Sequence, residues 1–259
     1  MRILIAGYGF VGHAFDKAVN MTNEITISDP AKGYFISPHH LVQTQAIVIC
    51  VSTPQGSHGG CHMDNVYEVI EQSPDVPILI KSTISLEGWE MLKHVFPNKS
   101  ICFSPEFLRA ETADEDFKNM DYTIIAGDPK DTEFWNKWFK QQVCWSDLEI
   151  YNCPVPEAIT LKYAENSYLA LKVSFFNQLY DFCQVTNQDF ETMRKLLCLD
   201  KRIGNSNSMV TEERGWGGHC FPKDTSAFLK TAEKYSYDLN ILRTAVDYNK
   251  KIRKTIDNQ

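Results

Sequence analysis

The residues that first suggest chemistry lie in one ten-residue stretch, GWGGHCFPKD, which runs from Gly215 to Asp224. Pro222 marks the first turn of an expected helix, so the Cys220 sulfur should lie at or just before its positive N-terminal end, with Lys223 nearby. Both features favour the thiolate form of a cysteine. Asp224 lies one helical turn further on and can face the same site. The stretch fits a nucleophile beside water-activating groups, or a helix start with an unreactive cysteine.

Two further groups of residues have spacings that suit a polar site. Lys162 and Asn166 are four residues apart in KYAEN, so both project from one face of an expected helix and could stabilise an oxyanion. Spacing alone favours the alternative, in which both are solvated surface residues. Glu106, in SPEFLR, follows a predicted strand at the edge where doubly wound sheets bind ligands. The alternative for Glu106 is the acidic first turn of a helix.

A third pattern is typical of a dinucleotide site. GYGFVG supplies Gly7, Gly9 and Gly12 between an expected strand and an expected helix. The first glycine turns the chain, the second lets backbone approach a pyrophosphate, and the third lets helix pack on strand. The Asp29 carboxylate can accept hydrogen bonds from both hydroxyls of the adenosine ribose and would repel a 2′-phosphate, which favours NAD over NADP. The nearby Lys32 still leaves NADP as an alternative. The alternative is an α/β domain that simply needs a tight turn.

The elements that must position these residues alternate in type along the first half of the chain, which predicts a Rossmann-type, doubly wound and mostly parallel α/β sheet. Expected strands are 2–6, 24–28, 46–51, 77–81, 100–104 and 122–127. Expected helices lie near 11–20, 64–72, 86–95 and 129–141. Two hydroxyl-rich segments, 51–54 (VSTP) and 81–83 (KST), follow the third and fourth strands and suit either contacts to a cofactor or helix capping.

The pattern changes near Pro154, after which apolar residues recur at helical spacing. Pro156 suits the first turn of a long helix, and Asp189 is an expected N-cap for a second one. A loop near 200–219 and helices near 222–235 and 239–257 complete the expected all-helical part. We therefore expect two domains, an NAD-binding domain over 1–150 and a helical domain over 151–259 that carries the Lys/Asn pair and the cysteine loop.

Bulk properties exclude some classes of protein. The formal net charge of −7 disfavours a nucleic-acid partner held through phosphates, and no apolar run approaches the ~20 residues that a membrane span needs. The chain opens directly into an expected strand, and its eight cysteines are scattered, so we expect a cytoplasmic protein with reduced thiols. His58, Cys61 and His62 could chelate an ion, but the stretch is more typical of an exposed turn, so no metal is predicted.

Taken together, these segments resemble the UDP-glucose/GDP-mannose 6-dehydrogenase family. The matching stretches occur in the family's order and span nearly the whole chain: GYGFVG, VSTP, KST, SPEFLR, EAITLKYAENSYLALKVSFFN, RIG and GWGGHCFPKD. The family oxidises the C6 hydroxymethyl group of a nucleotide sugar to a carboxylate in two NAD-dependent steps. The resemblance therefore implies an NAD-dependent oxidoreductase, with UDP-glucose as the expected substrate.

The resemblance also implies roles for individual residues. Cys220 would add to the intermediate aldehyde as a thiohemiacetal, which a second hydride transfer converts to a thioester that water hydrolyses. Lys162 and Asn166 would stabilise the oxyanions, and Asp224 would help to activate water. The other catalytic residues implied are Glu106, as acid/base, and Thr83, near the nicotinamide. The implied cofactor-binding residues are Gly7, Gly9, Phe10, Val11, Gly12, Asp29, Val51, Ser52, Thr53, Pro54, Thr83 and Lys223. The implied substrate-binding residues are Glu106, Phe107, Leu108, Arg109, Lys162, Asn166, Arg202, Trp216 and Gly217.

The resemblance also implies a homodimer that forms through the helical domain, as in the family, with Arg202 reaching across the interface.

Three departures from the family's sequence concern the fit of the substrate. Ala110-Glu111 stands where the family usually has Glu-Gly, the loop after RIG is slightly longer, and KSTISLEG carries an extra residue before its glycine. Family members also continue into a third domain that holds much of the nucleotide diphosphate. We expect a natural short form, a separate chain that supplies the missing part, or a fragment.

Two other interpretations stay open at this point. A β-hydroxyacid dehydrogenase-like oxidoreductase shares a Rossmann-type domain followed by helices, but that class uses a lysine without a nucleophilic cysteine. A non-catalytic NAD-binding subunit that needs a partner chain would keep the fold without turnover. Cys220 in its Gly-Gly and Lys-Asp setting argues against the first, and the presence of every expected catalytic group argues against the second.

Overall fold

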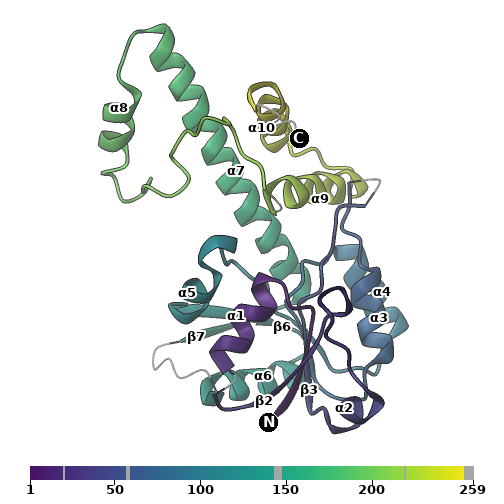
Figure 1. Cartoon of the computed structure of the whole chain (residues 1–259). Coiled ribbons are helices and arrows are strands. Elements are labelled where there is room, and N and C mark those ends of the chain that lie inside the picture. The colour runs from purple at the N-terminus through teal and green to yellow at the C-terminus, as the bar shows by residue number, and fades with distance from the viewer. Residues whose placement is uncertain (20, 57–58, 143–147, 219, 254–259) are drawn as a thin grey trace. The chain divides into compact units, whose positions relative to one another are not determined.

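The structure, a computed structural model, describes residues 1–19, 21–56, 59–142, 148–218 and 220–253. It divides the chain into two compact units. The first contains Met1–Gly56 and Cys61–Lys162, and the second begins at Tyr163 and also includes Gly59 and Gly60 from the loop after the third strand. Figure 1 shows the helices and strands of the two units.

The first unit is built on a seven-stranded sheet in the order β2-β1-β3-β4-β5-β6-β7. The strands are β1 (Arg2–Ala6), β2 (Glu24–Ser28), β3 (Ala46–Ile49), β4 (Ile78–Ile80), β5 (Ile101–Phe103), β6 (Tyr122–Ala126) and β7 (Glu149–Cys153). The first five strands pair in parallel, β6 is antiparallel to β5, and β7 is parallel to β6. Strand order reverses between β1 and β3, and in such sheets ligands bind beyond the carboxyl ends of the strands at that point.

Helices cover both faces of this sheet (Figure 1). They are α1 (Phe10–Val19), α2 (Pro38–Gln43), α3 (Asp64–Gln72), α4 (Leu86–Val95), α5 (Ala113–Lys118) and α6 (Pro129–Gln142), with 3-10 turns at Pro30–Lys32 and Ala110–Thr112. Phe15 of α1, Phe117 of α5 and Trp135 of α6 are fully buried together against one face of the sheet. Strands β3, β4 and β5 are buried along their whole length, because helices cover both of their faces.

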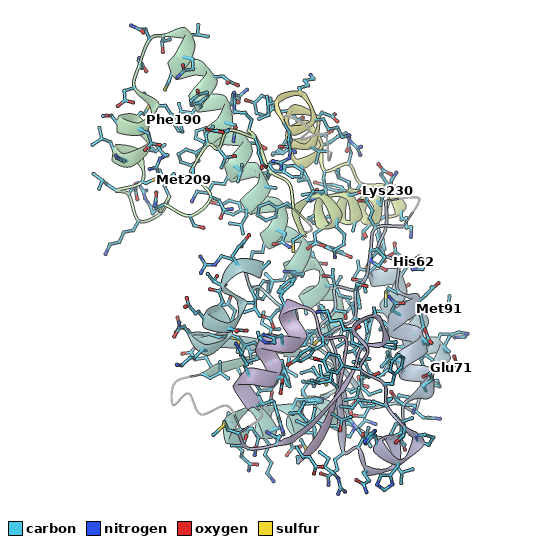
Figure 2. The ribbon with its side chains drawn as sticks, viewed as in Figure 1. His62, Glu71, Met91, Phe190, Met209 and Lys230 are labelled. Carbon is cyan, nitrogen blue, oxygen red and sulfur yellow. The ribbon has the colours of Figure 1, made fainter. Side chains whose placement is uncertain are left out.

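The second unit is helical. It consists of most of α7 (Val155–Val185), then α8 (Phe190–Leu197), α9 (Cys220–Lys234) and α10 (Asn240–Ile252). Pro156 lies in the first turn of α7, and the Asp189 carboxylate caps α8 by accepting from two backbone N–H groups. Phe190, labelled in Figure 2, packs with Phe176 and Cys183 in one apolar cluster, and Trp216 packs with Ala170 and Val173 in another.

The structure confirms the predicted α/β class, with all six expected strands present. Strand β7 and the short helices α2 and α5 were not predicted, and Asp29 directly follows β2. Helix α9 begins at Cys220, two residues before the expected start at Pro222, and α10 ends at Ile252 within the part that the structure describes. None of the described helices is both long enough and apolar enough to cross a bilayer.

Candidate active site

The loop between β1 and α1 has the geometry that a dinucleotide site requires. Gly7 has φ +88°, and a Cβ there would lie 2.6 Å from the backbone of Cys50 and Val51. A Cβ at Gly12 would lie 2.2 Å from the Gly7 carbonyl oxygen, so only glycine lets α1 approach the loop this closely. Around Gly9, by contrast, nothing lies within 4 Å of a built Cβ. The loop is therefore closed against the protein at Gly7 and Gly12 and open at Gly9, where a pyrophosphate would approach.

The carboxylate expected at the ribose is held beside this loop. Asp29 Oδ2 accepts a hydrogen bond from the Tyr8 backbone N–H at 2.8 Å. The Lys32 ammonium donates to the Tyr8 carbonyl at 2.5 Å, so it is engaged within the loop. Phe10, the first residue of α1, is 39% exposed. The open glycine, the helix N-terminus and the carboxylate together fit a dinucleotide with free ribose hydroxyls.

Replacing Asp29 with asparagine is expected to weaken discrimination between the two nicotinamide cofactors. Asparagine keeps an oxygen acceptor for the Tyr8 N–H but removes the charge that repels a 2′-phosphate. The ratio of the dissociation constant for NADP to that for NAD, measured by titration calorimetry, should fall about tenfold, the size of one charge interaction near a surface. Glu24→Gln is the control, because Glu24 is exposed at the start of β2, the strand that Asp29 follows, and it should leave the ratio unchanged. An unchanged ratio in Asp29→Asn would contradict the assignment of the ribose subsite.

In the hydroxyl-rich segments after β3 and β4, some side chains are buried or bonded within the protein and others are exposed to solvent. Ser82 Oγ donates to the Val51 carbonyl at 2.7 Å, and Thr53 is 6% exposed, so both contribute to local packing. Ser52 and Pro54 are exposed. Thr83 is half-buried, and its backbone carbonyl accepts from the Cys61 thiol at 3.2 Å. Contacts from these segments to a cofactor stay predictions.

Glu106 is the centre of a buried charged cluster in the first unit. Its Oε2 lies 2.9 Å from Lys81 Nζ, with the two side chains 8% and 1% exposed respectively. Its Oε1 accepts from the Phe107 N–H at 3.1 Å, and Lys81 Nζ also donates to Ser104 Oγ at 3.1 Å. Lys162 Nζ donates to the backbone carbonyl of Glu106 and lies 5.1 Å from the centre of the Phe107 ring. The unit thus brings together Glu106, Lys162 and a second lysine.

The second lysine, Lys81, was not predicted from the sequence, because only the hydroxyl groups of the KST segment were considered as site residues. A signal was available, because Lys81 ends the continuously apolar run PILIK, and a lysine buried in such a run needs a charged or polar partner. Burial raises the pKa of the neighbouring Cys50 thiol to about 12, with Lys81 acting to lower it and Glu106 to raise it. Cys50 is therefore a neutral thiol beside this ion pair.

Burial and an ion pair hold part of the segment that follows Glu106 within the same unit. Phe107 and Leu108 are half-buried. The Arg109 guanidinium donates to the Asp116 carboxylate at 2.5 and 3.0 Å, and these bonds lower the pKa of Asp116 to about 2. Ala110 and Glu111 are both exposed in a 3-10 turn. A substrate contact by Arg109 would compete with this ion pair.

The second unit holds the cysteine and its expected partners. Cys220 is the first residue of α9 and is partly exposed, so its sulfur is not enclosed in the interior. Asp224, one turn further along α9, is 1% exposed. Its Oδ2 accepts from Asn166 Nδ2 at 2.5 Å, and its Oδ1 lies 2.8 Å from Lys223 Nζ. Side chains one turn apart have Cβ atoms about 5–6 Å from each other, so Cys220 and the held carboxylate share one face of α9.

The expected substrate residues of the second unit differ in exposure. Trp216 is 5% exposed, and its indole N–H donates to Ser174 Oγ at 2.9 Å, so it is a packing residue in this structure. A Cβ at Gly217 would lie 2.4 Å from the Arg253 guanidinium. The side chain of Arg202 is 89% exposed and is paired with Asp200 at 2.5 Å. Substrate contacts by these residues stay predictions.

The expected site residues therefore form two groups, one in each unit. The first unit carries the glycine loop, Glu106 and Lys162, and the second carries Asn166, Cys220 and Asp224. Lys162 and Asn166 lie one turn apart on α7, which runs through both units. Within the described part of the chain, no three His, Cys, Asp or Glu residues are placed to hold a metal ion, and His58 of the alternative chelating stretch lies outside that part.

Comparison with known proteins supports the family resemblance that the sequence motifs indicate. Residues 156–251 match the model of the UDP-glucose/GDP-mannose dehydrogenase family, central domain. A UDP-glucose 6-dehydrogenase of Rickettsia bellii is 31% identical over 219 residues, which are 81% of this chain and 50% of that protein. A UDP-glucose 6-dehydrogenase of Bacillus subtilis is 28% identical over 81% of this chain and 49% of its own length. The chain thus spans about half the length of these curated relatives.

Solved structures agree at the level of the fold. A UDP-glucose dehydrogenase from Pyrobaculum islandicum superposes with a TM-score of 0.82 and 24% identity over 96% of this chain and 68% of its own. A 3-hydroxyisobutyrate dehydrogenase of Mycobacterium tuberculosis gives a TM-score of 0.76 with 13% identity, over 96% of this chain and 93% of its own. The sequence relatives decide between families that share this fold. The chain belongs to the UDP-glucose/GDP-mannose dehydrogenase family.

Proposed function

We propose that this chain catalyses the NAD-dependent, four-electron oxidation of the C6 hydroxymethyl group of a nucleotide sugar, with UDP-glucose as substrate and UDP-glucuronate as product. The observation that carries the proposal is the arrangement on α9. A partly exposed cysteine at its first residue precedes, by one turn, a buried carboxylate held by Lys223 and Asn166. A dehydrogenase that makes one oxidation needs no nucleophile, whereas two oxidations at one carbon benefit from covalent capture of the aldehyde.

Each of the two oxidations would use one molecule of NAD, which when bound would accept one hydride. The first oxidation leaves an aldehyde at C6, and Cys220 Sγ forms a bond to that carbon while the carbonyl oxygen takes up the charge and then a proton. Lys162 and Asn166 supply N–H donors for this oxyanion. Loss of a second hydride and of the hydroxyl proton gives a thioester. Attack by water then breaks the C–S bond, which releases the carboxylate and returns the thiol.

Asp224 and Glu106 handle protons in this scheme. Two donors fix the orientation of the Asp224 carboxylate, and a carboxylate has about four lone-pair sites, so acceptor capacity remains for a proton from water. Glu106 accepts the proton of the C6 hydroxyl group, with its carboxylate oriented by Lys81 and by the Phe107 N–H. Thr83 lies half-buried after β4 and acts near the nicotinamide.

A second candidate function is favoured by one observation, the fold likeness to a 3-hydroxyisobutyrate dehydrogenase over almost the whole of that chain. An enzyme of that kind would oxidise a small hydroxy acid once. It would not need the cysteine that precedes Asp224 on α9. The stoichiometry of cofactor reduction separates the two functions, because the nucleotide-sugar oxidation transfers two hydrides and the hydroxy-acid oxidation transfers one.

The substrate class is tested by incubating the purified protein with NAD and a panel of nucleotide sugars while NADH absorbance is followed. The nucleotide sugars are UDP-glucose, GDP-mannose and UDP-N-acetylmannosamine, and serine is tested beside them as a small hydroxy acid. We expect turnover with UDP-glucose above the other compounds. Turnover with serine alone would favour the second function, and binding of NAD without turnover of any compound would indicate a non-catalytic subunit.

We also propose that the protein is a homodimer through its helical unit. Tyr168, Phe175 and Phe182 are spaced seven residues apart on α7 and are 63%, 57% and 57% exposed. Residues at this spacing lie on one side of a helix, so α7 presents an aromatic stripe to solvent. Such a stripe is typical of a surface that a second copy covers.

Charge placed in the α7 stripe is expected to dissociate the dimer. Phe175→Asp should weaken dimerisation about 100-fold, as loss of an aromatic anchor at an interface does. Sedimentation equilibrium measures the change. Met91→Asp is the matched control, because Met91 is 53% exposed on α4 of the first unit (Figure 2) and should leave the dimer intact. A wild-type protein that is monomeric at high concentration would contradict the proposal.

The cysteines support a cytoplasmic location, which we also propose. The cysteines that the structure describes form no disulfide, and Cys144 lies outside the described residues. Free thiols persist in reducing compartments, whereas secreted proteins of this size pair many of theirs. Labelling of the thiols in protein isolated under non-reducing conditions would test this point, and paired cysteines would contradict it.

A further inference from the structure

We propose that Asn249 in α10 is a positioning residue that fixes the path of the chain into Cys220. Asn249 Oδ1 accepts from the Trp216 backbone N–H at 2.7 Å, and Asn249 Nδ2 donates to the Trp216 carbonyl at 2.9 Å. Asn249 is 7% exposed and Trp216 is 5% exposed, so both bonds are shielded from water. One amide thus satisfies both backbone groups of a single loop residue, as a neighbouring β-strand would.

The loop that Asn249 holds has a backbone that would not adopt this path unaided. Arg214 has φ +59° and Gly215 has φ +55°, and a left-handed conformation is unfavourable for a residue such as arginine. Asn177 of α7 is fully buried, and its Oδ1 accepts from the Arg214 side chain and from the Gly215 N–H, each at 3.0 Å. A Cβ at Gly215 would lie 2.1 Å from Asn249 Oδ1. The loop is therefore clamped between an asparagine of α7 and an asparagine of α10.

The side chain of Trp216 connects the held loop to the residues beside Cys220. Its indole N–H donates to Ser174 Oγ, which fixes the ring against α7. The ring lies edge-to-face with Phe221, with the centroids 6.5 Å apart and an interplanar angle of 85°. Phe221 directly follows Cys220 and packs into the same apolar cluster as Trp216. The position of Cys220 at the start of α9 is thereby coupled to the two bonds that Asn249 makes.

Directional bonds are needed because apolar contacts alone allow Trp216 to shift along the cluster. A displacement of about 1 Å in a reacting group is enough to reduce a rate about 100-fold. The consequence for catalysis rests on the proposed function, in which Cys220 is the nucleophile. The consequence for loop structure does not, so the two can be measured separately.

Two variants and one control test the proposal. Asn249→Asp keeps the size and one acceptor but places an oxygen against the Trp216 carbonyl, so it separates hydrogen bonding from space filling. Asn249→Ala removes both bonds. Leu242→Ala is the control, because Leu242 is 4% exposed on the same helix and makes no side-chain hydrogen bond. Hydrogen exchange of the 213–218 segment, resolved by mass spectrometry, is compared with exchange in the rest of α9 and α10.

We expect exchange in the 213–218 segment to rise about tenfold in both Asn249 variants, beyond any rise elsewhere in the unit, as loss of a buried hydrogen bond implies. Leu242→Ala should raise exchange by a similar factor in the 213–218 segment and in the rest of the unit. For a nucleotide sugar that the wild type oxidises, kcat should fall about 100-fold in the Asn249 variants with little change in KM. Exchange and kcat in Asn249→Asp that match the wild type would overturn the proposal. If the wild type oxidises no nucleotide sugar, the proposed function fails and the exchange measurement still decides the role of Asn249.

Discussion

Replacing Cys220 with alanine is expected to eliminate conversion of the nucleotide sugar to its uronate. Without the sulfur, no thiohemiacetal forms and the second oxidation has no covalent substrate. We expect the rate of uronate formation, measured by chromatography, to fall by roughly 10³-fold or more, as loss of a catalytic nucleophile does. Serine at the same position should stall the pathway after the aldehyde or during hydrolysis of the ester.

The control for this experiment is Cys198→Ser, which alters another partly exposed cysteine of the same unit. It should keep the wild-type rate. Binding of NAD to Cys220→Ala should also be unchanged, because the glycine loop belongs to the other unit. A Cys220→Ala protein that forms uronate at the wild-type rate would remove the sulfur from the mechanism.

Replacing Lys81 with methionine is expected to cause a large loss of stability in the first unit. The substitution leaves the Glu106 carboxylate buried without its cation, and breaking a buried pair from one side costs roughly 3–5 kcal/mol. The free energy of unfolding, from urea titration, measures this loss. Oxidation of substrate should fall as well, because Glu106 loses the group that orients its carboxylate.

A double variant makes the test of the Lys81–Glu106 pair specific. Lys81→Met combined with Glu106→Gln removes both charges, so much of the lost stability should return while activity stays low. Lys93→Met is the matched control, since Lys93 pairs with Asp128 at 3.1 Å on the surface and should cost less than about 1 kcal/mol. Equal losses in Lys81→Met and Lys93→Met would show that the buried pair has no special role.

The parts of the fold that could be predicted from the sequence are those encoded by neighbouring residues. The glycine loop needs three glycines within six positions, and each constraint can be stated from the spacing alone. The Asp189 cap of α8 is equally local. Strands β3 and β4 were recognisable because a strand covered on both faces is apolar throughout.

The parts that could not be predicted depend on contacts between distant residues. Strand β7 is an edge strand with mostly exposed residues, so it carries no continuous apolar run, and α2 and α5 are each only six residues long. The Lys81–Glu106 pair joins residues that follow two adjacent strands, and it becomes visible only once β4 and β5 are in register. Helix α9 starts before Pro222 because proline is tolerated within the first turn.

The candidate site shows the same division. Lys162, Asn166, Cys220 and Asp224 were found from spacing, since each pair lies one turn apart on a helix. The hydrogen bond from Asn166 to Asp224 links α7 to α9 over 58 positions and could not be anticipated. The burial of Trp216 is a further example, because its polar partners come from two other helices.

The number of NADH molecules formed for each nucleotide sugar consumed tests the central claim most directly. Limiting UDP-glucose is incubated with excess NAD, NADH is measured by absorbance, and the sugar nucleotides are quantified by chromatography. The account predicts two NADH for each UDP-glucose consumed, with UDP-glucuronate as the product and no free aldehyde. One NADH for each sugar, with an aldehyde accumulating, would contradict it.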